Sequence, residues 1–168
     1  MSHVAGVRSA VDVTLSARDF DDPDSTCLLH AYAQERRGVV GFDDPPGLDK
    51  PSQYHSPSGL FVVAYTTAAD PFACGGVRTY PDRDHVMEIR KMYVAPGYRK
   101  IGLGRRVLAE LEQHAAAYGA HEVILETGSY NQAAMHMYTS AGYHLIPAYV
   151  PDRPDFNRAF AKTLTTAS

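Results

Sequence analysis

The sequence predicts one α/β domain built around a mixed sheet. Its 168 residues are 45% hydrophobic and 21% charged, which supplies enough apolar material for a single buried core. Short segments with the alternation of a strand are interspersed with segments of helical periodicity. The chain contains neither an internal repeat nor a low-complexity tract, which excludes a solenoid.

The first third of the chain predicts a strand, a helix and a loop. Val11, Val13 and Leu15 alternate with polar residues, as in a strand with one buried face. Acidic residues and a proline at 21–25 are typical of a helix start, and the helical spacing that follows ends at Gly38. Residues 43–59 are rich in proline and predict a loop or short helical turns.

A hairpin and a charged strand are predicted next. Residues 60–65 and 73–80 form the hairpin, and the pair Gly75 and Gly76 indicates a bulge in its second strand. In the strand at 86–94, simple alternation places Arg90 on one face with Met92 and Val94, and Lys91 on the other face with Tyr93. Charged residues on both faces of a central strand are typical of a functional site.

The last half of the chain predicts two helices and three strands. A helix at 105–118 ends at Gly119 and buries a stripe of Val107, Leu108, Leu111, Ala115 and Tyr118. Residues 123–125 form a buried strand. Asn131 caps a second helix that Gly142 ends. Strands at 143–146 and 158–164 complete the domain.

Composition restricts the partners and the compartment. The formal charge of −3 and the pI near 6.2 argue against a protein that holds a nucleic acid. We expect no membrane segment and no signal peptide, because no long apolar run is present. Cys27 and Cys74 cannot form a disulfide framework and are interpreted as small core residues, so a reducing cytoplasm is the expected location.

The basic turn at 98–106 predicts an anion site. Between Glu88 and Glu110 the chain has no acidic residue but six lysines and arginines, although it is acidic overall. A strand, a glycine turn and a helix start together supply free N–H groups and a positive dipole end to a phosphate. Turn glycines beside a solvated basic helix are the alternative. The spacing fits neither a P-loop nor a dinucleotide fingerprint.

The wider pattern resembles the GNAT superfamily of acyl-CoA-dependent N-acyltransferases. The turn Arg99-Lys100-Ile101-Gly102-Leu103-Gly104 matches the family's pyrophosphate signature Gln/Arg-x-x-Gly-x-Gly/Ala. The segments 92–98, 126–128 and 131–143 resemble the family's strand entry and the second half of its cofactor site. The resemblance is close over 86–149. Residues 1–85 agree only in the order of their elements.

The resemblance implies a fold, a cofactor and a set of binding residues. The fold is a mixed, mostly antiparallel sheet of six to seven strands, flanked by helices and splayed at the cofactor site. One domain spans 1–168, with a cofactor-binding core at about 86–149 and substrate-side elements at about 11–80 and 147–164. The cofactor is acetyl-CoA, and its implied contacts are Met92, Tyr93, Val94, Arg99, Lys100, Ile101, Gly102, Leu103, Gly104, Arg105, Asn131 and Tyr138.

Two catalytic residues follow from the same resemblance. Glu88 is the expected general base, through a water, and the alternative is an ion pair with Arg90 or Lys91. Tyr138 is expected to protonate the departing thiolate, and the alternative is a core tyrosine. A backbone N–H near Tyr93 or Val94 would bind the thioester oxygen. Asn131 is expected both to cap its helix and to contact the pantetheine arm.

The acceptor is expected to be the primary amine of a small molecule, namely an amino acid, a polyamine, an antibiotic or a biosynthetic intermediate, acetylated by direct attack in a ternary complex. Acids at 19–24 and 43–49 form either a rim for a cationic amine or a helix-capping surface. Protein or peptide acetylation and a non-catalytic acyl-CoA sensor remain as alternatives. The histidine spacing argues against a metal site. A homodimer is compatible with the sequence.

Overall fold

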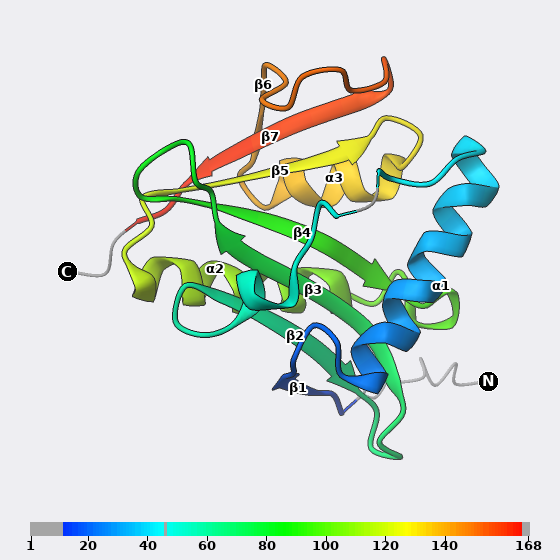
Figure 1. The fold of residues 1–168 in the computed structure, drawn as a ribbon. Helices are drawn as coiled ribbons and strands as arrows, with labels where there is room; N and C mark the ends of the chain where they lie inside the picture. The colour runs from blue at the N-terminus through cyan, green and yellow to red at the C-terminus, as the bar shows by residue number, and fades with distance from the viewer. Residues whose placement is uncertain (1–11, 46, 166–168) are drawn as a thin grey trace, which may run out of the picture.

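The computed structural model describes residues 12–45 and 47–165 and contains one seven-stranded sheet. Its order is β1-β2-β3-β4-β5-β7-β6, and β4 and β5 form the one parallel pair among the described strands (Figure 1). The expected mixed, mostly antiparallel sheet is therefore confirmed. The strands are β1 (Thr14–Ala17), β2 (Gly59–Tyr65), β3 (Pro71–Thr79), β4 (Val86–Val94), β5 (Glu122–Gly128), β6 (His144–Ile146) and β7 (Asn157–Thr163).

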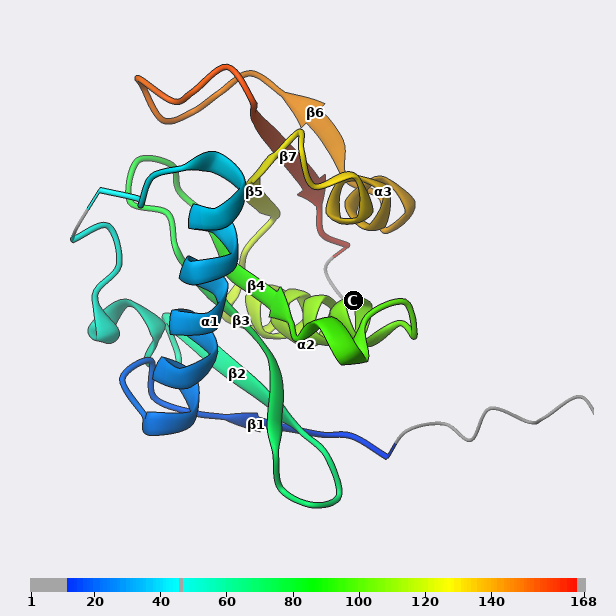
Figure 2. The same ribbon diagram turned by 90° about the vertical axis from the view of Figure 1, so that its right-hand side faces the viewer.

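Helices cover both faces of the sheet. The helix α1 (Pro23–Val40) lies on one face, and α2 (Leu103–Tyr118) and α3 (Gln132–Ser140) lie on the other (Figure 2). We call the α1 side the front face. Two short 3-10 turns, Pro51–Tyr54 and Pro96–Tyr98, interrupt the loops.

The helix ends follow local capping chemistry. The Asp22 side chain accepts a 2.9 Å hydrogen bond from the Asp24 amide at the start of α1. This helix continues past Gly38 and ends at Gly41, whose φ of 84° is left-handed. The helix α2 starts at Leu103, two residues before the predicted start, because Gly102 takes a φ of 83°. The predicted strand residue Val11 lies outside the described residues.

The core has one layer on each face. Behind the sheet, α2 buries Val107, Leu108, Leu111 and Ala115 against the strands, as predicted. Tyr118 does not belong to this stripe. It is the last residue of α2, and its side chain is 47% exposed, so that prediction is wrong. In front, α1 packs on a second cluster of Leu28, Tyr54, Phe61, Val63, Tyr65, Cys74 and Tyr93.

A β-bulge changes the face of half of β4. The register between β3 and β4 shifts between Cys74 and Gly76, which confirms the predicted irregularity at the glycine pair. On β4 the shift falls at Lys91, whose φ is 62°. The simple alternation predicted for this strand is therefore wrong beyond Arg90. Lys91 joins Arg90 on the front face, and Tyr93 packs there in the α1 cluster.

The two central strands separate toward their carboxyl ends. The pairing of β4 with β5 ends at Ile89 and Leu125, although β4 continues to Val94 and β5 to Gly128. The expected splay is confirmed, and the strands diverge visibly in Figure 1. Backbone N–H groups of β4 that point toward β5 beyond Ile89 have no strand partner there.

Candidate active site

A cavity of about 730 Å³ opens where β4 and β5 separate. Its walls come from α1, the turn before α2, the start of α3 and the segment 153–157. Eleven of the twelve residues expected to bind the cofactor line it: Met92, Tyr93, Val94, Arg99, Lys100, Gly102, Leu103, Gly104, Arg105, Asn131 and Tyr138. Ile101 does not line it, and its side chain is 43% exposed.

The turn at 99–104 presents backbone N–H groups to this cavity. Positive φ values at Lys100 and Gly102 reverse the chain immediately before α2. The first N–H groups of α2 have no partner within the helix, and its dipole adds positive charge at the same place. A Cβ on Gly104 would lie 3.2 Å from the Met137 sulfur, so glycine lets α2 pack close to α3. This is the geometry of an anion site.

Arg99 positions the turn through its side chain. Its guanidinium donates 2.7 Å hydrogen bonds to the Val94 carbonyl and to the Glu35 carboxylate on α1. The hydrogen bond with Glu35 raises the pKa of Arg99. Arg105 in turn donates a 2.9 Å hydrogen bond to the Ser140 carbonyl at the end of α3. The two arginines thus hold the turn between α1 and α3.

Asn131 and Tyr138 belong to the two ends of α3, Asn131 as its N-cap and Tyr138 in its last turn. Asn131 caps α3 by accepting a 3.1 Å hydrogen bond from the Ala134 amide, as predicted. The Tyr138 side chain is 4% exposed and packs edge-on against Tyr143, with ring centroids 5.7 Å apart. Burial raises the pKa of Tyr138, so its phenol is protonated at neutral pH. Its hydroxyl donates no hydrogen bond to another described residue, although the residue borders the cavity.

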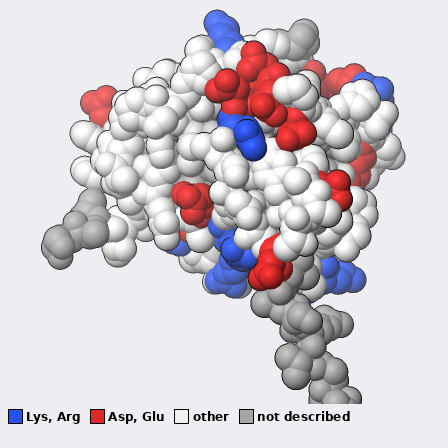
Figure 3. All heavy atoms as spheres, turned by 90° about the horizontal axis from the view of Figure 1, so that it is seen from below, with Lys and Arg blue, Asp and Glu red and all other residues white. Residues whose placement is uncertain are grey.

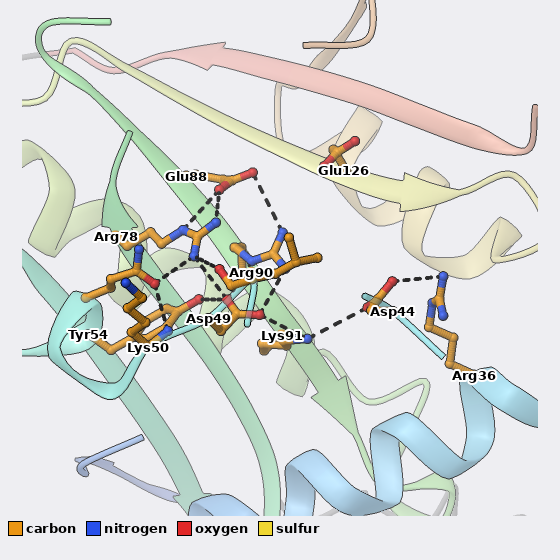
Figure 4. Close-up of polar contacts among 12 residues, drawn as sticks. Arg36, Asp44, Asp49, Lys50, Tyr54, Arg78, Glu88, Arg90, Lys91 and Glu126 are labelled. Carbon is orange, nitrogen blue, oxygen red and sulfur yellow. Dashed lines mark hydrogen bonds and ion pairs between the residues drawn. The ribbon is translucent and has the colours of Figure 1, made fainter. Parts of the chain in front are cut away.

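Glu88 lies at the centre of a buried polar network (Figure 4). One carboxylate oxygen accepts hydrogen bonds from Arg78 at 3.0 and 3.2 Å, and the other accepts a 2.6 Å hydrogen bond from the Tyr149 hydroxyl. Its side chain is 2% exposed and does not line the cavity. The structure therefore brings the predicted site residues together except for Ile101, which is exposed, and Glu88, which lies within an ion pair outside the cavity.

Asp49 joins the same network from the loop before the first 3-10 turn. It accepts hydrogen bonds from Arg90 at 2.7 and 3.0 Å and one from Arg78 at 3.2 Å. Burial alone would raise the pKa of Asp49, but the hydrogen bond from Arg90 and the charges of Arg90 and Lys91 outweigh it and lower the pKa. Asp49 and Arg90 are 41 residues apart in sequence, so no local pattern indicates the pair.

The acids of the first third do not form an open rim at 43–49. Asp43 pairs with Arg37 at 2.8 Å, Asp44 pairs with Arg36 at 3.1 Å, and Asp49 is buried in the network. The helix-capping alternative is confirmed for Asp22. Seen from below, acidic atoms gather with basic atoms beside them, and most of that face carries neither charge (Figure 3).

Further residues enter the cavity that were not among the predicted site residues. Glu126, at the splayed end of β5, accepts hydrogen bonds from Arg153 at 2.9 and 3.1 Å. Tyr32, Phe156 and Asn157 also line the cavity. Glu126 falls within a segment that resembles the family. The sequence around Arg153 and Phe156 shows no motif, so it gave no signal that they belong to the site. Their place at the cavity depends on the path of the chain after β6.

The cysteines differ from each other in burial. Cys74 is buried, as predicted, and burial raises its pKa to about 12. Cys27 lies exposed on α1, so its assignment to the core is wrong. In the part of the chain that the structure describes, no group of three or more histidine, cysteine or acidic side chains could hold a metal ion. No described helix is long and apolar enough to cross a membrane.

Comparison with known proteins decides the family. A model of the Acetyltransferase (GNAT) family matches residues 28–143. The chain belongs to the GNAT family. An IAA acetyltransferase of Azospirillum brasilense is 34% identical over 68 residues, which are 40% of this chain and 44% of that protein. The L-amino acid N-acyltransferase MnaT of Escherichia coli is 32% identical over 77 residues, 46% of this chain and 44% of that protein. The chain thus matches less than half the length of each relative.

Solved acetyltransferase structures share the fold. A GNAT family acetyltransferase of Staphylococcus aureus superimposes with a TM-score of 0.73 at 16% identity, over 92% of this chain and 100% of that chain. A Salmonella typhimurium structure with its cofactor acetyl-CoA gives a TM-score of 0.70 at 16% identity, over 94% of this chain and 96% of that chain. At this level of identity the likeness concerns the fold alone.

Proposed function

We propose that this GNAT protein is an N-acyltransferase that moves an acetyl group from acetyl-CoA to the primary amine of a small molecule. The observation that carries the proposal is the single cavity that joins the anion site before α2 to the splay between β4 and β5. A cofactor with phosphates at one end and a reactive thioester at the other requires both features in one continuous space.

The residues of the cavity fit acyl-CoA. The α2 N-terminus, Lys100 and the Gly102 turn suit the pyrophosphate, because they supply N–H groups and positive charge. Met92 and Met137 supply apolar surface for the pantetheine arm. When bound, the cofactor supplies an activated acyl group. The N–H groups of β4 that have no partner on β5 beyond Ile89 suit the oxygen on which negative charge develops.

Two proton transfers complete the proposed reaction. The amine nitrogen attacks the thioester carbonyl, the carbon–sulfur bond breaks, and the thiolate takes a proton from Tyr138, whose raised pKa keeps it protonated. The amine must lose a proton. Glu126 lines the cavity at the splay, whereas Glu88 does not. We therefore assign proton acceptance to Glu126 and treat Glu88 as a positioning residue for Arg78 and Tyr149.

A small acceptor is supported by the walls that stand on two sides of the cavity. The C-terminal part of α1 contributes Arg36 and Val39 to the lining, and the segment 153–157 contributes Arg153, Pro154, Phe156 and Asn157. The names of two relatives, an IAA acetyltransferase and an L-amino acid N-acyltransferase, agree with small-molecule acceptors for those proteins.

Amine-dependent release of the CoA thiol tests the proposal. The purified protein is incubated with acetyl-CoA and a panel of small amines, amino acids and a lysine peptide. We expect thiol release with at least one small amine and slower release with the peptide. Release with the peptide alone would favour protein acetylation, and cofactor binding without release by any amine would favour a sensor.

A further inference from the structure

One cation on the wall of the cavity is held more loosely than its neighbours. Arg90 pairs with Asp49 at 2.7 Å, Arg36 with Asp44 at 3.1 Å and Arg153 with Glu126 at 2.9 Å. The Lys91 ammonium lies 3.4 Å from Asp49 and 3.9 Å from Asp44, both of which already bind an arginine. It donates no hydrogen bond to another described residue.

The ion pairs around Lys91 leave one cation in excess. Four cations and three carboxylates form one connected network among the described residues: Arg36, Arg78, Arg90 and Lys91, with Asp44, Asp49 and Glu88, whereas Arg153 and Glu126 form a separate pair. Each arginine has a carboxylate within 3.2 Å. The Lys91 side chain is 17% exposed, so its charge is only partly hydrated. An anionic ligand would compensate it.

The β4 bulge brings Lys91 to this position. A lysine at a φ of 62° is uncommon, because a Cβ is crowded in the left-handed region. The bulge turns Lys91 to the front face next to Arg90, so two consecutive residues point at the same carboxylate (Figure 4). Lys91 also lies 5.8 Å from the ring of Tyr32, which borders the same cavity. A strained backbone that delivers a loosely paired cation is typical of a ligand site.

Aromatic side chains form a second wall. The rings of Tyr130 and Phe156 lie 5.4 Å apart, and Phe42 lies 6.3 Å from Phe156. Phe42 comes from the segment after α1, Tyr130 from the β5–α3 loop and Phe156 from the β6–β7 loop. Tyr130 and Phe156 line the cavity, and Phe42 and Tyr130 are 46% and 41% exposed. Exposed rings at the mouth of a cavity provide apolar surface for a ligand.

We propose that the acceptor amine carries a carboxylate and an apolar side chain. Its carboxylate binds the ammonium of Lys91, and its side chain packs on Tyr130 and Phe156. The acceptor class is therefore an apolar amino acid, and Lys91 is the residue that selects the carboxylate. This inference rests on the proposed function, because it concerns the acceptor of that reaction.

The test compares two amines that differ only in the carboxylate, L-phenylalanine and phenethylamine. Calorimetry measures their binding to the protein saturated with CoA, and thiol release from acetyl-CoA measures their KM and kcat. We expect phenylalanine to bind at least about tenfold more tightly than phenethylamine and to have a correspondingly lower KM. A charge-assisted contact between the carboxylate and Lys91 accounts for a difference of this size. Equal binding of the two amines, or no binding of either, would overturn the assignment.

Variants of Lys91 locate the effect. In Lys91→Met we expect the KM for phenylalanine to rise about tenfold and the KM for phenethylamine to stay constant. In Lys91→Arg we expect the preference for phenylalanine over phenethylamine to remain. Lys50→Met is the matched control, since Lys50 is exposed and makes no ion pair with a described residue. Thermal unfolding of each variant checks that it folds. An unchanged preference in folded Lys91→Met would contradict the role of Lys91.

The aromatic wall has a separate readout. We expect L-phenylalanine to have a lower KM than L-alanine, and Phe156→Ala to reduce that difference severalfold. Equal KM values for the two amino acids would overturn the apolar part of the assignment. Failure of the proposed function is recognised independently: acetyl-CoA would not bind, or its thiol would not be released by any amine, whereas a wrong acceptor assignment leaves both intact.

Discussion

The hydroxyl of Tyr149 lies 2.6 Å from a carboxylate oxygen of Glu88 and connects the segment after β6 to the centre of β4. Burial, and then the charge of Glu88, raises the pKa of Tyr149, so the phenol donates throughout the neutral range. The second oxygen of Glu88 accepts from Arg78. Glu88 thus holds together segments that are far apart in sequence.

Removal of this hydroxyl is expected to destabilise the fold. In Tyr149→Phe the buried oxygen of Glu88 loses its donor, which costs about 2 kcal/mol because the acceptor is charged. Urea unfolding measures the difference. Tyr118→Phe is the control, since Tyr118 is exposed, and it should change the free energy of unfolding by less than about 0.5 kcal/mol. Equal stability of the two variants would contradict the role assigned to Tyr149.

Asp49 makes stability depend on pH in the acid range. The pKa of its carboxyl is below the ordinary 3.8 in the folded protein, so the unfolded chain binds its proton first as pH falls. The stabilisation by Asp49 is complete above about pH 5 and is lost as pH falls below about 4. In Asp49→Asn, Arg90 loses its charged partner, and we expect a loss of about 3 kcal/mol at pH 7.

The pH dependence of that loss checks the sign. Urea unfolding of the wild type and Asp49→Asn is compared between pH 7 and pH 3. The difference in their free energies of unfolding should shrink toward pH 3. A constant difference over this range would show that the charge of Asp49 is not responsible.

Tyr138→Phe is expected to slow the reaction without weakening cofactor binding. The substitution removes the proton donor for the thiolate and leaves the packing against Tyr143 in place. General acid catalysis contributes on the order of 100-fold, so kcat should fall by about that factor. Steady-state kinetics and acetyl-CoA calorimetry separate the two effects. An unchanged kcat would make Tyr138 a core residue only.

Glu126 and Glu88 are distinguished by their pH profiles. In Glu126→Gln the amine must lose its proton to solvent, so kcat/KM relative to the wild type should be lowest at low pH and recover as pH rises. Glu88→Gln should lower stability and leave the shape of the profile unchanged, because Glu88 lies outside the cavity. The reverse pattern would return the role of the base to Glu88.

Local patterns predicted the parts of this structure that depend on neighbours in sequence. The turn at Gly102, the cap at Asn131 and the glycine pair in β3 each need a backbone conformation or a contact that only a few residue types allow. The splay, and the gathering of the residues expected to bind the cofactor around one cavity, followed from the family resemblance, because the motif fixes their spacing.

The remaining features depend on contacts between distant segments. The face of Lys91 was predicted wrongly because a bulge on β4 depends on its register with β3, which alternation in one strand cannot show. The ion pair of Arg90 with Asp49 and the approach of Arg153 to Glu126 depend on how two loops cross the sheet. These tertiary contacts decide which charges face the cavity.

The most direct test of the cavity as an acyl-CoA site is calorimetric titration of the protein with acetyl-CoA. We expect one binding site per chain. In Gly102→Ala we expect acetyl-CoA to bind about tenfold or more weakly, because the φ of 83° at Gly102 disfavours a residue with a side chain. Gly97→Ala, which points into open space at an ordinary φ, should bind like the wild type. Absence of binding by the wild type, or equal binding by both variants, would contradict the account.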